Sequence, residues 1–232
     1  MKNNNRINKI MKLFVVTCIF FIGLNLYSQK ISKVDQTELI RELQKWNKTN
    51  DNMSFSFWIP NSYWRVVLSE NKQVPKEFID KIESVFKNYI LLIVGDLKIE
   101  LDGTMTYTEE SFLRKSISIT DKLGENHYPL SSNQITPDTN DFVNYIKPMF
   151  AQMLGQMGKG MHIYLFDIKN QKNENIINEL ETGEFIVKHS EKEFKWNLPL
   201  VSLLETKYCP IDKEEMKGNW NFCPIHGIKL SE

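Results

Sequence analysis

The sequence of 232 residues is poor in cysteine and histidine, and it lacks the short motifs of the common hydrolases. It contains only 3 cysteines and 4 histidines. Neither Gly-x-Ser-x-Gly nor His-Glu-x-x-His occurs, and His127, His162 and His189 each stand alone in the sequence. The sequence therefore predicts no local active site, and an enzyme would need a site assembled from distant residues.

Long hydrophobic runs are also missing, and the clearest apolar stretch covers only residues 13–24, behind a basic N-terminus. A membrane-crossing helix needs about 20 apolar residues. This stretch is shorter and has the layout of a removable secretory signal, with a retained anchor as the alternative. We predict that residues 1–28 are a signal peptide cleaved between Ser28 and Gln29. The mature protein is then expected in the periplasm or cell envelope, or secreted.

An excess of charge of either sign is absent, because 29 basic residues balance 29 acidic ones. Cleavage would remove Lys2, Arg6, Lys9 and Lys12, leaving 25 basic against 29 acidic residues and a net charge of −4. A mildly acidic chain gives no electrostatic reason to bind nucleic acid or an anionic membrane. We predict an unknown protein or small-molecule partner, no nucleic acid, and membrane contact only during export.

Hydrophobic periodicity predicts an α+β body over residues 29–205, with a mainly antiparallel sheet and packed amphipathic helices. The hairpin signals are strongest at Asp102-Gly103 and between the two last strands. Helices are expected over 35–48, from Pro75 onward and over 138–154. Strands are expected over 54–60, 90–94, 97–101, 116–120, 161–168, 184–189 and 194–198.

Two matching hexapeptides stand near the C-terminus, Tyr-Cys-Pro-Ile-Asp-Lys from residue 208 and Phe-Cys-Pro-Ile-His-Gly from residue 222. They resemble the paired Cys-Pro-x-Cys-Gly knuckles of the zinc-ribbon family over about residues 208–230. The resemblance implies a small knuckle at 206–232 that holds one structural zinc through Cys209, Asp212, Cys223 and His226. The second cysteine of each knuckle is replaced here, and Lys213 stands where that family has a glycine.

The two cysteines left after export also allow two other states. In an oxidising compartment Cys209 and Cys223 can form a disulfide, and a bridge closing a loop of about 15 residues would contribute roughly 3 kcal/mol. A degenerate relic with neither bond is the third state. The disulfide gives no reason for Asp212 and His226 to follow the two cysteines at equivalent positions, so the repeat itself favours zinc.

We therefore expect an exported binding or interaction module of unidentified activity with a structural metal knuckle. The alternative is a cell-envelope hydrolase whose site combines sequence-distant residues. A cleft holding two or more of His127, His162 and His189 with nearby carboxylates would favour the enzyme. An exposed apolar or aromatic patch would favour the binding module.

The first prediction concerns export. The exported protein should begin at Gln29, because the basic N-terminus and the short apolar run match a cleaved signal. Intact mass of the exported protein measures this directly. A full-length species retained in the membrane would contradict it.

Overall fold

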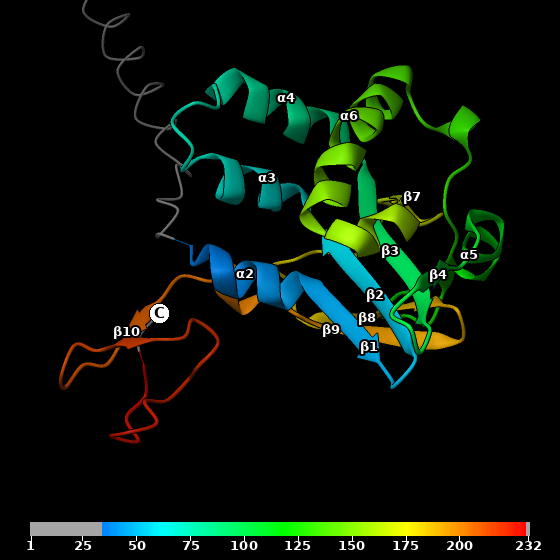
Figure 1. Ribbon diagram of the computed structural model, residues 1–232. Helices are drawn as coiled ribbons and strands as arrows, with labels where there is room; N and C mark the ends of the chain where they lie inside the picture. Colours follow the sequence, from blue (N-terminus) through cyan, green and yellow to red (C-terminus); the bar gives the residue numbers. More distant parts are fainter. Residues whose placement is uncertain (1–33, 231–232) are drawn as a thin grey trace, which may run out of the picture. The chain divides into compact units, whose positions relative to one another are not determined.

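The computed structural model describes residues 34–230, so the predicted signal peptide lies outside the described residues. This part of the chain combines helices with antiparallel sheets, which confirms the α+β class (Figure 1). The helices are α2 (Gln36–Leu43), α3 (Asn61–Leu68), α4 (Lys76–Phe86), α5 (Glu110–Ser116) and α6 (Pro137–Met153), with the 3-10 turns η1 (Ser132–Gln134), η2 (Gly155–Gly160) and η3 (Val201–Leu203). The strands are β1 (Gln44–Lys48), β2 (Asn52–Ile59), β3 (Tyr89–Ile99), β4 (Met105–Tyr107), β5 (Ser118–Thr120), β6 (Asn126–His127), β7 (Met161–Asp167), β8 (Gly183–His189), β9 (Lys192–Leu198), β10 (Lys207–Tyr208) and β11 (Glu215–Met216).

The first sheet is built around β2 and β3. These strands pair antiparallel from Asn52↔Lys98 to Ile59↔Leu91, while β1 lies on the far side of β2. The long strand β3 also pairs with β4 near its end and with β7 along its first half. All these ladders are antiparallel. The hairpin predicted at Asp102-Gly103 is present between β3 and β4, with Gly103 at φ +84°.

Helices α3, α4 and α6 cover one face of this sheet (Figure 1). Alternate residues of β2 point to that face, where Phe57 and Ile59 line a cavity of about 130 Å³ together with Tyr63 of α3 and Phe150 of α6. Trp64 of α3 completes the contact by stacking on a ring of α4. The apolar stripes of the helices are therefore buried against the sheet, as their periodicity predicts.

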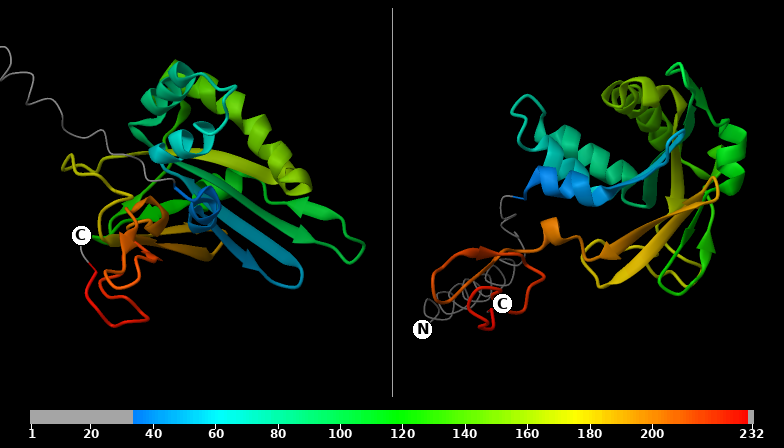
Figure 2. Two further views of the ribbon diagram at one scale, coloured as in Figure 1. Left: turned by 90° about the vertical axis from the view of Figure 1, so that its left-hand side faces the viewer. Right: turned by 60° about the horizontal axis from the view of Figure 1, so that its bottom comes forward.

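The second sheet, in the order β6-β5-β8-β9, packs against the other face (Figure 2). Trp58 of β2 contacts Phe185 of β8 at 4.9 Å between ring centroids, and Phe185 stacks on Trp196 of β9 at 4.9 Å. All three rings are buried. Because side chains alternate along a strand, β2 supplies Trp58 to this layer and its neighbours Phe57 and Ile59 to the helices.

A polar contact crosses the same interface between the sheets. Ser54 of β2 donates to the carboxylate of its cross-strand partner Asp96 in β3, and Thr108 donates to the same carboxylate at 2.7 Å. Lys192 of β9 then donates to Ser54 Oγ at 2.8 Å and to Asp96 at 3.2 Å. The side chains of Lys192 and Asp96 are 22% and 13% exposed, so their hydrogen bonds satisfy charges that water reaches only in part.

The structure corrects the helix expected over residues 35–48. Its first half is α2, but the second half is strand β1, which pairs with β2. Trp46, which lies within the range predicted as helix, instead contacts Phe55 and Phe57 at ring distances of 5.3 and 5.0 Å. Cross-strand aromatic contacts override local helical periodicity here. Helices α3 and α5 were not predicted.

Within residues 34–230, no helix has the length and hydrophobicity needed to cross a membrane.

We predict that Asp96→Asn lowers the free energy of unfolding by about 2–3 kcal/mol, because it leaves the Lys192 ammonium buried without its counter-charge. Glu100→Gln is the matched control: Lys98 and Glu100 also lie 3.2 Å apart, but both side chains are about half exposed. That substitution should cost less than about 0.5 kcal/mol. Denaturant unfolding measures both values, and equal losses would contradict the assignment.

The Asp96 carboxylate also makes the free energy of unfolding depend on pH. Burial would raise the pKa of Asp96, but hydrogen bonds from Ser54 and Thr108 and the charge of Lys192 outweigh burial and lower the pKa below 3.8. Because the pKa of Asp96 is lower in the folded than in the unfolded chain, Asp96 stabilises the fold at pH values above its unfolded pKa. This stabilisation is lost as the pH falls through the folded pKa. In Asp96→Asn the part of the fall in stability at low pH that comes from protonation of Asp96 should be absent.

Candidate metal centre

The two C-terminal hexapeptides fold into the same turn. In the first, the amide of Lys213 donates to the carbonyl of Cys209 at 2.9 Å, and in the second, the amide of Gly227 donates to the carbonyl of Cys223 at 2.8 Å. Lys213 has φ +64° and Gly227 has φ +65°. The sequence repeat is therefore also a backbone repeat, and Lys213 adopts the left-handed conformation that the other knuckle gives to glycine.

The strands around each turn match as well. The Cys209 amide donates to the carbonyl five residues later at 2.9 Å, and the Cys223 amide does the same at 2.8 Å. The residue before each cysteine pairs with the residue six positions after that cysteine, as Tyr208↔Glu215 in β10 and β11 and as the isolated bridge Phe222↔Lys229. Each cysteine is thus held at the start of a tight hairpin.

The sulfur atoms belong to a small core separate from that of the body. Cys209 and Cys223 are 0% and 1% exposed, and they pack with Met216 and Leu230 against the partly buried Trp220. The opposite side of the site is more open, because the side chains of His226 and Asp212 are 28% and 30% exposed. The thiols are therefore shielded on one side, while the imidazole and the carboxylate face solvent.

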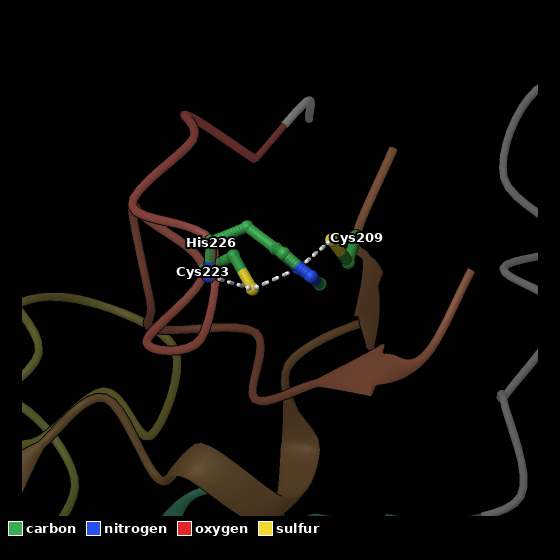
Figure 3. Close-up of side chains that lie close together, drawn as sticks. All are labelled: Cys209, Cys223 and His226. Atoms are coloured by element: carbon green, nitrogen blue, oxygen red, sulfur yellow. Dashed lines mark hydrogen bonds between the residues drawn. The ribbon is translucent and has the colours of Figure 1, made fainter. Parts of the chain in front are cut away.

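Three of the four predicted ligands meet at one point (Figure 3). The ligand atoms of Cys209, Cys223 and His226 all lie within 4.8 Å of one another. His226 Nδ1 is 3.3 Å from the sulfur of Cys209 and 3.6 Å from that of Cys223. Asp212 lies outside this group of mutual neighbours, although its Oδ2 is 3.5 Å from His226 Nδ1. The three residues of the group could bind a metal ion.

Three of the six edges of a tetrahedral site can be compared with these separations. Around a zinc ion with ordinary bond lengths, a sulfur–nitrogen edge measures about 3.6 Å and a nitrogen–oxygen edge about 3.4 Å. The three edges that meet at His226 Nδ1 are 3.3, 3.6 and 3.5 Å. One ring nitrogen carries either a single proton or a single lone pair, so it cannot satisfy three partners by hydrogen bonding. A metal ion bound by the group would satisfy these contacts together.

The two thiols differ in acidity. Burial, together with the side chains of Asp212 and Cys223, raises the pKa of Cys209. Burial opposes ionisation of Cys223 too, but the amides of His226 and Ile225 and the His226 side chain outweigh it and lower the pKa of Cys223. Its amide contact from His226 measures 3.4 Å. Backbone amides and the His226 side chain therefore favour the thiolate at this site, the form in which cysteine binds a metal.

The remaining histidines do not share a site. Within residues 34–230, the other group with metal-capable side chains is Asp121, Glu125 and His127, which also contains one histidine. There His127 Nε2 lies 2.9 Å from Asp121, whose other oxygen accepts two backbone amides of the same turn. This network closes the turn between β5 and β6. His162 and His189 belong to neither group, and burial lowers the pKa of each, for His189 to about 4.

Sequence reasoning found the cysteines and the histidine of this site but missed two of its features. The amides of the two residues before each left-handed position point to the sulfurs, and they act through the backbone, which leaves no residue signature. The cover from Met216 and Trp220 also went unnoticed, although both residues lie between the hexapeptides. Comparison with protein-family models, with characterised proteins and with solved structures gave no match.

The backbone repeat yields a paired prediction. Lys213→Gly should stabilise the first knuckle by about 1 kcal/mol, because glycine adopts positive φ without strain. Gly227→Ala should destabilise the second knuckle by about 1 kcal/mol, because alanine is strained at positive φ. A Cβ at this position would meet no atom within 4 Å, so backbone strain is the sole expected cause. Amide hydrogen exchange at Cys209 and Cys223 reports each knuckle. Weaker protection in Lys213→Gly would contradict the shared turn.

Proposed function

We propose that residues 206–232 form a zinc-ribbon-like knuckle that holds one structural zinc ion through Cys209, Cys223, His226 and Asp212. The observation that carries the proposal is the position of His226 Nδ1, 3.3 and 3.6 Å from the two sulfurs and 3.5 Å from the Asp212 carboxylate. Two thiolates, one imidazole and one carboxylate are all ordinary zinc donors. Only this explanation gives every one of the four side chains a role.

A structural metal would also explain how so small a knuckle is stabilised. The core of the knuckle consists of Cys209, Met216, Cys223 and Leu230, with Trp220 at its edge. So few apolar side chains cannot offset the conformational entropy of ordering the segment. Small folds of this kind are usually held by a metal or a disulfide, and here a metal uses His226 and Asp212 as well.

We propose further that the exported protein is a binding or interaction module, and that the knuckle presents part of its contact surface. Exposed large hydrophobic side chains are concentrated there. The repeat places Tyr208 and Phe222 at one pair of equivalent positions and Ile211 and Ile225 at another, and each of the four is 49–65% exposed. Apolar side chains gathered at the surface are typical of protein contact sites. The partner remains an unidentified protein or small molecule.

The alternative, a cell-envelope hydrolase, gains less support. His127 is engaged by Asp121 within its own turn, and His189 is 1% exposed. A general base must reach substrate, so a fully buried imidazole is a poor candidate. Lys192 lies 2.8 Å from Ser54 Oγ, but Ser54 is 0% exposed and donates its proton to Asp96. Ser54 is therefore a buried hydrogen-bonding residue and a poor candidate for a nucleophile.

Metal content tests the proposal. Mature protein purified without chelator should contain one zinc per chain, because the thiolates and imidazole are already gathered. Cys209→Ser, Cys223→Ser and His226→Ala should each weaken zinc binding by more than about 100-fold, since even second-shell changes cost 10–100-fold. His127→Ala is the matched control and should leave zinc content unchanged, because His127 is engaged by Asp121 in another turn.

Intact mass measured beside metal content separates zinc from the disulfide. Absence of zinc together with a two-hydrogen mass deficit that reductant restores would show a Cys209–Cys223 bridge and defeat the proposal. Unchanged zinc content in His226→Ala would remove His226 from the ligand set. Zinc content that survives loss of either cysteine would place the metal elsewhere.

A further inference from the structure

We infer that the fourth coordination position of this metal centre is exchangeable, held weakly by Asp212 and open to an external thiolate. The inference rests on the proposed metal knuckle and concerns which ligands that knuckle takes. It makes the centre a place where a thiol-bearing small molecule or a cysteine of another chain can join the metal. A purely structural site, in contrast, has four fixed protein ligands.

The first argument is geometric. Cys209, Cys223 and His226 already form a three-ligand face, with their ligand atoms all within 4.8 Å of one another. Asp212 does not belong to that group, because its carboxylate contacts His226, at 3.5 Å, and Cys209, but does not lie equally close to all three ligand atoms. Three ligands are therefore pre-organised, whereas the carboxylate must adjust to complete the tetrahedron. A ligand that must move to bind contributes less affinity than one already in place.

The second argument is the competing contact of the carboxylate. Asp212 Oδ1 accepts the backbone amide of Glu214 at 3.1 Å. This bond closes the turn of the first knuckle whether or not a metal is present. Asp212 therefore keeps a structural partner when its other oxygen leaves the metal, and displacement leaves the carboxylate hydrogen-bonded and open to solvent.

The third argument is access. The two sulfurs are buried under Met216, Leu230 and Trp220, so nothing reaches the metal from that side. The Asp212 and His226 side chains are 30% and 28% exposed. The carboxylate is therefore one of two solvent-facing donors, and beside two thiolates and an imidazole it is the hardest, least well matched donor. An incoming ligand would take its place without disturbing the buried thiolates.

The fourth argument selects the ligand. A centre with two thiolates and one imidazole prefers soft donors, and thiolate is softer than carboxylate. An external thiolate carries the same charge as Asp212, so the exchange leaves the charge on the metal unchanged. The exchange breaks the metal–oxygen bond and forms a metal–sulfur bond. The thiol proton goes to solvent or to the released carboxylate, and no oxidant or reductant takes part.

Cobalt(II) in place of zinc makes the exchange visible. The full mature chain is loaded with one cobalt under anaerobic conditions, and 2-mercaptoethanol is titrated in while the sulfur-to-cobalt charge-transfer absorption is followed. An increase of about 1.5-fold is expected, because two thiolates per metal become three. Dialysis should show that cobalt stays with the protein throughout.

Variants at the corner residue make the test specific. Asp212→Asn should still bind cobalt and should need several-fold less 2-mercaptoethanol for half-saturation, because the competing carboxylate is gone. Asp212→Cys should show the higher absorption from the start and no response to the thiol. Glu214→Gln is the matched control, since it removes an equal charge from the same hairpin while keeping the backbone amide that binds Asp212. It should behave as the unmodified protein does.

The two levels of the proposal fail differently. A chain that binds no cobalt through thiolates defeats the metal knuckle itself. A chain that binds one cobalt but shows no change in charge-transfer absorption at saturating thiol has a closed site, and the inference is then wrong while the knuckle stands. Removal of cobalt by the thiol, with loss of the absorption, also overturns the inference, because the thiol would then compete with the protein instead of joining it.

Discussion

The antiparallel register between β2 and β3 determines which side chains of the body can meet. It places Ser54 opposite Asp96 and directs both toward the second sheet, where Lys192 joins them. A shift by one residue would turn every side chain of β2 to the other face, sending Trp58 to the helices and Phe57 to the second sheet. Both layers of the core thus depend on one ladder, and the contact of Ser54, Asp96 and Lys192 near one end favours this alignment.

The knuckle depends on different physics. Its two turns are short-range structures, each closed by one amide-to-carbonyl bond and one left-handed residue, Lys213 or Gly227. Contacts within a few residues form readily but stabilise little on their own. What joins the two turns is the meeting of Cys209, Cys223 and His226 from different hairpins. The body is thus held by a large apolar interior, whereas the knuckle has only a small apolar core around its two cysteines.

The sequence was sufficient where local chemistry decides and insufficient where tertiary contacts decide. The turn at Asp102-Gly103 and the hairpin of β8 and β9 were predictable because alternation and turn residues act over short distances. Strand β1 was not, because Trp46 continues a helical pattern and only its contact with β2 makes it a strand residue. At the candidate metal centre, spacing identified the residue types but not their unequal placement. Nothing in the hexapeptides indicates that Asp212 contacts His226 and Cys209 without joining the group of mutual neighbours.

Asp212 and His226 both stand three residues after a cysteine, but their side chains make different contacts. In the second knuckle His226 turns its ring between the two sulfurs, because an imidazole is long enough to reach Nδ1 contacts of 3.3 and 3.6 Å from its own turn (Figure 3). In the first knuckle Asp212 is shorter, and one of its oxygens is drawn back to the Glu214 amide. Two identical backbones therefore present one ligand that reaches the centre and one that stays at its edge. The asymmetry of the site therefore follows from side-chain length together with the hydrogen bond of Asp212 to the Glu214 amide, and it needs no change in the backbone turn.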